Sequence, residues 1–383
     1  MTITTAGRGL IAGAAVALVV GIGATSVAAQ PAQIAGTAVA AGVSIAEVPA
    51  VRPVAPVVPV QPGYGHGGSP TATTGTATTA QQVGVVDIDT VLSYAGAEAA
   101  GTGLVLTSTG EILTNNHVVV GSTGIVVTIV SSGRSYPATV VGTDATADVA
   151  VLQLTGASGL ATANLAESAT VAVGDAVTGV GNAGGVGGRP AAAGGTVRAT
   201  GQSITTQAEG SAAAETLSGL IETDADIQAG DSGGPLFNAD DQVVGIDTAA
   251  QSGGPSTAGY AIPISTALGI ADQIEAGQAS QTIVIGYPAF LGVQVAPARY
   301  RYSRTGTAGA LISGVVSGGP AEAAGLSAGD TITALGGTAI ADSSALSTTL
   351  AGDAPGQSVT ITWVSSAGAT QSATVTLATG PAA

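Results

Sequence analysis

Three short motifs hold residues whose types could together carry out nucleophilic chemistry. Ser232 lies in Gly-Asp-Ser-Gly-Gly, His117 in Thr-Asn-Asn-His-Val-Val, and Asp148 directly before the apolar run Val-Ala-Val-Leu. A serine hydroxyl is a weak nucleophile unless a base accepts its proton, and a carboxylate can hold an imidazole base in the required tautomer. Asp144 is the rival of Asp148, but its context, Gly-Thr-Asp-Ala, is typical of a turn. We therefore expect a catalytic triad of His117, Asp148 and Ser232.

Glycines on both sides of Ser232 favour a tight backbone turn. We expect the N–H groups of Gly230 and Ser232 to form an oxyanion hole, which stabilises the negative oxygen that develops during attack on a carbonyl. The chain has two histidines, and His66 stands in a glycine-rich stretch near many prolines. His117 is therefore the available imidazole base.

The composition argues against several classes of protein. The 383 residues carry a net charge of −16, and all basic residues are arginine. Such a charge argues against a nucleic-acid binder and against polybasic docking on anionic lipid. Because the chain has no cysteine, disulfides, thiol catalysis and cysteine-based metal sites are excluded. No metal and no organic cofactor are expected.

The N-terminal segment predicts a location outside the cytoplasm. Residues 1–29 are typical of an export signal, with Arg8 before an apolar core and small residues before Gln30. The uncharged run 9–29 is also long enough to remain as a membrane anchor. Residues 30–82 are rich in proline, glycine and threonine, which predicts a linker.

Two folded domains are expected after the linker. Residues 83–286 contain short β-branched runs separated by glycine-rich breaks, a pattern that favours an all-β barrel or sandwich, with a closing helix at 267–276. The order His–Asp–Ser suits a protease made of two such barrels. Residues 287–383 combine short strands with helices near 320–325 and 343–351.

The three motifs together resemble those of the HtrA/DegP family of exported, trypsin-like serine proteases. Thr114 to Val119 resembles the segment of the family's catalytic histidine, Asp148 to Leu152 that of its aspartate, and Gln228 to Leu236 that of its nucleophile. The resemblance implies a mainly β fold, a chymotrypsin-like double β-barrel followed by a small α/β PDZ domain. It also implies assembly as a homotrimer.

The resemblance extends to the substrate pocket. Gly245 to Ala249 resembles the strand that lines the family's primary specificity pocket, so Asp247, Thr248 and Ala249 are the expected pocket residues. The family often has asparagine where this chain has Asp247. An inward carboxylate there would favour a basic residue before the cleaved bond, whereas the small Ala249 would favour a small aliphatic one.

Residues 319–330, Gly-Pro-Ala-x-x-Ala-Gly-Leu-x-x-Gly-Asp, resemble part of a PDZ domain. The N–H groups of Leu291, Gly292 and Val293 are then expected to hold the terminal carboxylate of a peptide that adds as a strand. Three arginines follow this strand: Arg299, Arg301 and Arg304. These arginines either belong to a solvated loop or attract that carboxylate.

These features predict an exported serine endopeptidase that cleaves unfolded or damaged proteins and binds peptide C-termini through its PDZ domain. The alternative is a chaperone or peptide-binding protein of the cell envelope with a latent or inactive protease site. A structural envelope protein would suit the low charge and high glycine content, but it would make three ordered motifs a coincidence.

Overall fold

The computed structural model describes residues 73–383 except 95, 168–169, 206–215, 252–257 and 298–305. The predicted signal or anchor at 1–29, most of the predicted linker with His66, and the three arginines after residue 298 lie outside the described residues. Within the described part, no helix combines the length and apolar character of a membrane span.

The first β-barrel follows from alternating apolar residues on short strands. Its strands are β2 (Val85–Leu92), β3 (Ala97–Val105), β4 (Glu111–Thr114), β5 (Gly124–Ile129), β6 (Arg134–Asp144) and β7 (Val149–Leu154). They pair in the order β5-β2-β3-β4-β7-β6, and β6 also pairs with β5, which closes the barrel. Alternate residues such as Val127 and Ile129 on β5 fill its interior, as the period of two along a strand requires.

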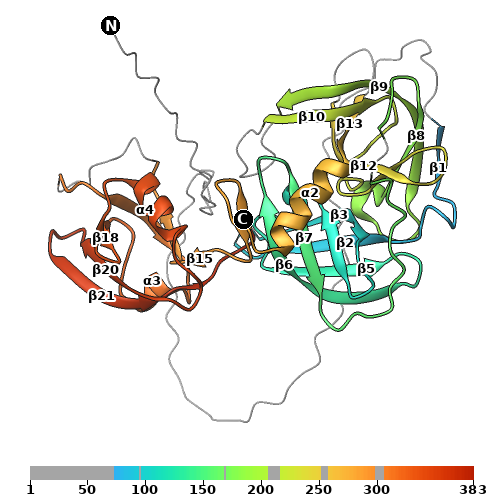
Figure 1. The fold of residues 1–383 in the computed structure, drawn as a ribbon. Helices are drawn as coiled ribbons and strands as arrows, with labels where there is room; N and C mark the ends of the chain where they lie inside the picture. The colour runs from blue at the N-terminus through green and yellow to red at the C-terminus, as the bar shows by residue number, and fades with distance from the viewer. Residues whose placement is uncertain (1–72, 95, 168–169, 206–215, 252–257, 298–305) are drawn as a thin grey trace, which may run out of the picture. The chain divides into compact units, whose positions relative to one another are not determined.

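The second barrel repeats this construction. Its strands are β8 (Ala176–Gly181), β9 (Ala191–Thr205), β10 (Thr216–Thr223), β11 (Pro235–Phe237), β12 (Val243–Gln251) and β13 (Ala258–Pro263). They pair in the order β9-β10-β13-β12-β11-β8, and β8 returns to β9. Helix α2 (Ile264–Glu275) follows β13 and packs on β6, β7 and β12, so it joins the two barrels (Figure 1).

The region expected to be linker ends earlier than the composition indicated. Strand β1 (Thr73–Thr76) pairs antiparallel with β9, and Ala77 is buried in the core. The threonine- and glycine-rich stretch is low in complexity, but threonine is β-branched and suits an edge strand on the open side of β9. At least residues 73–77 therefore belong to the second barrel.

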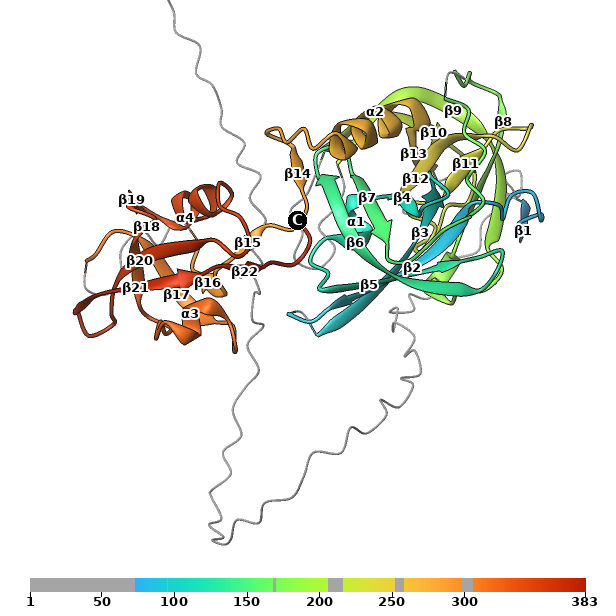
Figure 2. The same ribbon diagram turned by 60° about the horizontal axis from the view of Figure 1, so that its bottom comes forward.

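The C-terminal region is a small α/β unit around its own core. A sheet in the order β16-β17-β18-β20-β21 carries helices α3 (Pro320–Ala323) and α4 (Ser343–Leu350), as Figure 2 shows. The strands are β16 (Val293–Val295), β17 (Ala310–Val315), β18 (Thr331–Leu335), β20 (Ser358–Val364) and β21 (Thr370–Thr376); β19 (Thr338–Ala339) pairs with β18. Three further short strands are β14 (Ile283–Ile285), on the edge of β6, and the pair β15 (Ala289–Phe290) and β22 (Ala378–Thr379). The predicted fold class, a double β-barrel followed by a small α/β domain, is confirmed.

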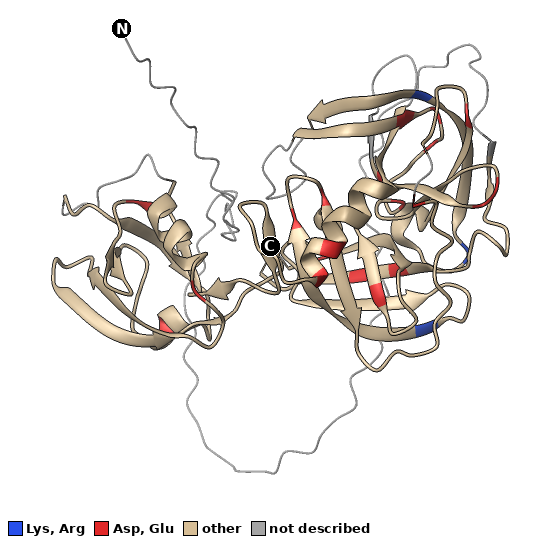
Figure 3. Cartoon of the chain, in the orientation of Figure 1, with Lys and Arg blue, Asp and Glu red and all other residues tan. Residues whose placement is uncertain are grey.

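Acidic side chains outnumber basic ones over the described residues (Figure 3). The arginines of this part are Arg134, Arg189 and Arg198, and Arg198 forms an ion pair with Asp224. The acidic charge favours encounters with cationic rather than anionic chains.

Candidate active site

The first barrel brings His117 and Asp148 together. His117 lies on the short helix α1 (Asn116–Val119) directly after β4, and Asp148 lies in the turn before β7. Because β4 and β7 are paired neighbours, these ends meet. The Nδ1 atom of His117 is 2.8 Å from Oδ2 of Asp148, and the backbone N–H of His117 donates to Oδ1 at 2.9 Å. The aspartate therefore holds both the ring and the backbone of the histidine.

The backbone of Asp148 has an unusual conformation that fits this task. Its φ is +55°, in the left-handed region that residues other than glycine rarely adopt. The side chain of Asn115 donates to the Asp148 carbonyl at 2.9 Å and stabilises the turn. Asp148 is 2% exposed, whereas the His117 side chain is 43% exposed. The carboxylate is thus shielded from water while the imidazole remains open to a reactant.

Thr248 is a member of this site that the sequence analysis assigned only to the substrate pocket. Its hydroxyl donates to Oδ2 of Asp148, the same oxygen that faces the His117 ring. Its carbonyl oxygen is 3.4 Å from Oγ of Ser232. Thr248 lies on β12 in the second barrel, so it connects the carboxylate of one barrel with the serine of the other. Residue spacing gave no signal for this contact, because the two residues are 100 positions apart.

Ser232 lies in the loop between β10 and β11 and reaches the first barrel through its backbone. The Thr102 N–H donates to the Ser232 carbonyl at 2.8 Å. A Cβ atom on Gly101 would lie 2.6 Å from Val118, the neighbour of His117, and 3.2 Å from the Ser232 carbonyl. The lack of a side chain at Gly101 therefore lets helix α1, which carries His117, and the loop that carries Ser232 approach each other closely. All three residues of the predicted triad lie at this junction.

The loop around Ser232 requires glycine at two positions, one on each side of the serine. Gly230 has φ +97°, and a Cβ atom there would lie 2.2 Å from the Asn182 carbonyl oxygen. Gly233 has φ +83°, and its Cβ would lie 2.1 Å from the Thr102 carbonyl oxygen. Within the described part of the chain, neither the Gly230 nor the Ser232 N–H donates a hydrogen bond. Both donors therefore remain available for a developing oxyanion.

The expected pocket residue Asp247 points inward. It is fully buried, and one of its oxygens lies 2.9 Å from the position that a Cβ on Gly179 would occupy, where Ile227 also packs. Burial, aided by the nearby Asp231, raises the pKa of the Asp247 carboxyl well above its usual value. Among the described residues no donor reaches either oxygen. Burial therefore disfavours the ionised form of this carboxyl, and with it the charge that would favour a basic residue.

The other two expected pocket residues lie beside Asp247 on β12. The backbone of Asp247 makes two hydrogen bonds to the loop that carries Ser232. The Gly233 N–H donates to the Asp247 carbonyl, and the Asp247 N–H donates to the Gly234 carbonyl. Ala249 belongs to the same strand and pairs with Tyr260 across the sheet. The strand that carries the pocket residues is thus directly hydrogen-bonded to the loop of Ser232.

The expected carboxylate cradle of the C-terminal domain lies at a sheet edge. Gly292 has φ +80°, and Val293 begins β16, which pairs with β17 on one side and stands at the end of the sheet. Leu291 is buried, and its carbonyl accepts from the Ala321 N–H at the start of α3. Among the described strands none pairs with the other side of β16, so that side can accept another strand.

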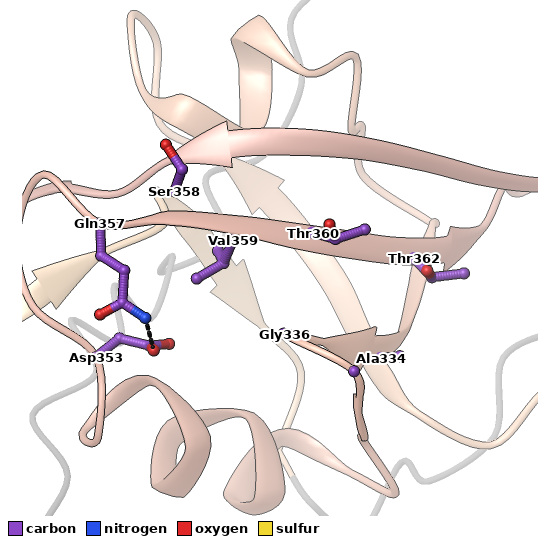
Figure 4. A pocket seen from close by; sticks show the side chains of 9 residues that line it. Ala334, Gly336, Asp353, Gln357, Ser358, Val359, Thr360 and Thr362 are labelled. Carbon is purple, nitrogen blue, oxygen red and sulfur yellow. Dashed lines mark hydrogen bonds between the residues drawn. The ribbon is translucent and has the colours of Figure 1, made fainter.

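A separate polar pocket lies on this domain (Figure 4). It is lined by residues of β18, β20 and their loops, among them Gln357, whose side chain donates to Asp353 at 2.7 Å. None of its lining residues belongs to the Leu291–Val293 segment. The pocket is thus distinct from the expected peptide groove.

Comparison with known proteins supports the organisation of the chain into two domains. Family models match residues 101–246 as a trypsin-like peptidase domain and residues 289–377 as a PDZ domain. Serine protease PepD of Mycobacterium tuberculosis is 34% identical over 311 residues, which cover 76% of this chain and 63% of the relative. A probable periplasmic serine endoprotease, DegP-like, of Pseudomonas fulva is 36% identical over 251 residues, 64% of this chain and 48% of the relative.

A solved structure, HtrA-type protease AlgW with tripeptide, is 30% identical and covers 80% of this chain and 96% of its own, with a TM-score of 0.45. The chain spans about half to two thirds of the length of the curated relatives named above. The two domain matches follow one another in the same order as the sequence motifs. Relatives named as serine proteases align with 76% and 64% of the chain. Together these matches identify the family. The chain belongs to the HtrA/DegP family of trypsin-like serine proteases with a PDZ domain.

Proposed function

We propose that this protein is an exported serine endopeptidase that hydrolyses peptide bonds in unfolded or damaged proteins. The observation that carries the proposal is the hydrogen-bonded chain from Thr248 through Asp148 to His117, at the junction where Ser232 also lies. A buried carboxylate on Nδ1 keeps the proton on that nitrogen, so the other ring nitrogen is available as a base.

The reaction then proceeds in two balanced halves. Ser232 Oγ attacks the carbonyl carbon while its proton passes to His117, and His117 returns this proton to the leaving amine as the peptide bond breaks. Water then attacks the Ser232 ester and gives a proton to His117, the ester bond breaks to release the acid, and His117 returns the proton to Ser232 Oγ. The N–H groups of Gly230 and Ser232 stabilise the oxyanion of each tetrahedral intermediate.

The pocket favours an uncharged residue before the cleaved bond. Burial disfavours the ionised form of the Asp247 carboxyl, and its surroundings include Ile227 and the close backbone of Gly179. A lysine or arginine side chain would have to bury its charge beside apolar groups and a carboxyl whose ionisation burial opposes, which is costly. Small aliphatic residues carry no such penalty.

The second domain is proposed to bind peptide C-termini. The open edge of β16 offers backbone groups for an added strand, next to the N–H groups of Leu291, Gly292 and Val293. Export is supported by the signal-like segment 1–29 and by relatives whose names call them periplasmic. Assembly as a homotrimer rests on the family resemblance, and sedimentation of the full chain tests it.

The deciding experiment compares the full chain with its Ser232→Ala variant. Casein cleavage and labelling by an active-site phosphonate should both be present in the parent and absent in the variant. If the parent remains silent after addition of a PDZ-binding peptide yet suppresses aggregation of an unfolded protein, the chaperone alternative is correct. Equal cleavage by both proteins would assign the nucleophile elsewhere.

A further inference from the structure

Thr102 belongs to the first barrel, yet it holds the serine loop of the second barrel at two points. It lies on β3, and its N–H donates to the Ser232 carbonyl at 2.8 Å. Its hydroxyl reaches the Gly230 carbonyl at 2.7 Å, across 128 positions of sequence. The two contacted carbonyls belong to the same residues whose N–H groups form the proposed oxyanion hole.

The direction of the Thr102 hydroxyl hydrogen bond is unambiguous. The backbone N–H of Asn182 donates to this hydroxyl oxygen at 2.9 Å. Because an N–H can only donate, the hydroxyl proton must point to the other partner, the Gly230 carbonyl. Thr102 is fully buried, so water does not compete for either bond.

Gly230 needs such external support. Glycine populates many backbone conformations, and nothing in its own structure selects the φ of +97° found here. The peptide before Gly230 is held by the Gly184 N–H, which donates to the Ala229 carbonyl at 2.7 Å. The peptide after Gly230 is held by the Thr102 hydroxyl. The Gly230 N–H lies in the first of these peptides. Because the second peptide is also held, the φ and ψ of Gly230 are fixed, and the first peptide cannot rotate about its single hydrogen bond.

We propose that Thr102 is a positioning residue for the oxyanion hole, whose hydroxyl aims the Gly230 N–H by anchoring its carbonyl to the barrel that carries His117 and Asp148. This inference rests on the proposed protease function. The Thr102 contact links the two halves of the site. Through β3 and its neighbouring strands, the N–H donors for the oxyanion are held in a fixed position relative to His117, the base for the proton transfer.

The test compares Thr102→Val with Thr102→Ser in the full chain. Valine keeps the shape and removes the hydroxyl, whereas serine keeps it. Thr223→Val is the matched control, because Thr223 is also fully buried and its hydroxyl donates to the Thr196 carbonyl and accepts from the Ala225 N–H. Phosphonate titration counts the active sites, and kcat and KM for a peptide substrate are then expressed per titrated site.

The expected result is a fall in kcat per site of about 10- to 100-fold for Thr102→Val, less than the loss of a whole donor, with little change in KM. Thr102→Ser should recover most of kcat, and the pH at which His117 limits the rate should not move. Thr223→Val should lower stability and leave kcat per site within about twofold, since its hydrogen bonds to Thr196 and Ala225 reach neither Gly230 nor Ser232.

Two results would overturn the inference without touching the proposed function. The first is a kcat per site for Thr102→Val that equals the parental value. The second is a fall in kcat per site for Thr223→Val as large as the fall for Thr102→Val. If Thr102→Val does not fold, Thr102→Ala takes its place, and failure of both to fold would assign the hydroxyl to folding alone. By contrast, a parent that neither cleaves nor reacts with phosphonate would refute the protease function itself.

Discussion

Asp231, the residue before the proposed nucleophile, should make the protein less stable as the pH rises. It is 4% exposed, one carboxyl oxygen accepts from the Gln228 N–H at 2.9 Å, and the other has no donor among the described residues. Burial raises the pKa of this carboxyl from 3.8 to about 6, the Gln228 hydrogen bond opposes that rise, and Asp226 adds to it. Replacement by asparagine retains an acceptor for Gln228 and removes the ionisation.

The sign and size follow from linkage. Below pH 3.8 both the folded and the unfolded chain hold the proton, so folding is unaffected by this group. Between 3.8 and about 6 the unfolded chain loses the proton first, and above this window the folded chain must bury a charge. The difference between the two pKa values corresponds to about 3 kcal/mol at pH 8. Asp231→Asn should therefore stabilise the protein by roughly this amount at pH 8 and very little at pH 4.

The assay is the free energy of unfolding by denaturant at pH 4 and pH 8. Both proteins should carry Ser232→Ala, so that self-cleavage does not distort the transition. Asp240→Asn provides the control, because Asp240 is exposed and its substitution should be nearly neutral at both pH values. A gain for Asp231→Asn that is the same at pH 4 and pH 8 would refute the argument from buried charge.

Three further predictions concern the site. Asp148→Asn should keep the fold but lower kcat by about 10⁴, because an amide cannot hold the same tautomer of His117; a parental kcat would exclude Asp148 from the triad. Thr248→Val should lower kcat about tenfold with unchanged KM, since one hydrogen bond to the Asp148 carboxylate is lost. Gly230→Ala should abolish phosphonate labelling, because the added methyl would meet the Asn182 carbonyl, and labelling at the parental rate would contradict the loop geometry.

Much of the proposed site could be inferred from the sequence because its signals are local. Ser232 is framed by glycines that a tight turn requires, and Asp148 precedes a run that forms a strand. The expected helices at 267–276, 320–325 and 343–351 correspond to α2, α3 and α4, since each depends on a nearby start or stop signal.

Other features have no local signal. Asp247 lies on a strand of expected pocket residues, and alternation alone does not say which face of β12 is buried. The burial of its carboxyl and the resulting rise in its pKa therefore emerged only from the packing. In the same way, composition placed residues 73–76 in a linker, whereas pairing with β9 makes them a strand.

The amino-acid sequence by itself determined the family and indicated the types and order of the proposed reacting groups, because these depend on residues a few positions apart. Only the tertiary structure decided which residues support them. The hydroxyls of Thr102 and Thr248 reach Gly230 and Asp148 over 128 and 100 positions. Such contacts arise where two closed barrels meet, and no short-range pattern records which side chains of one barrel face the other.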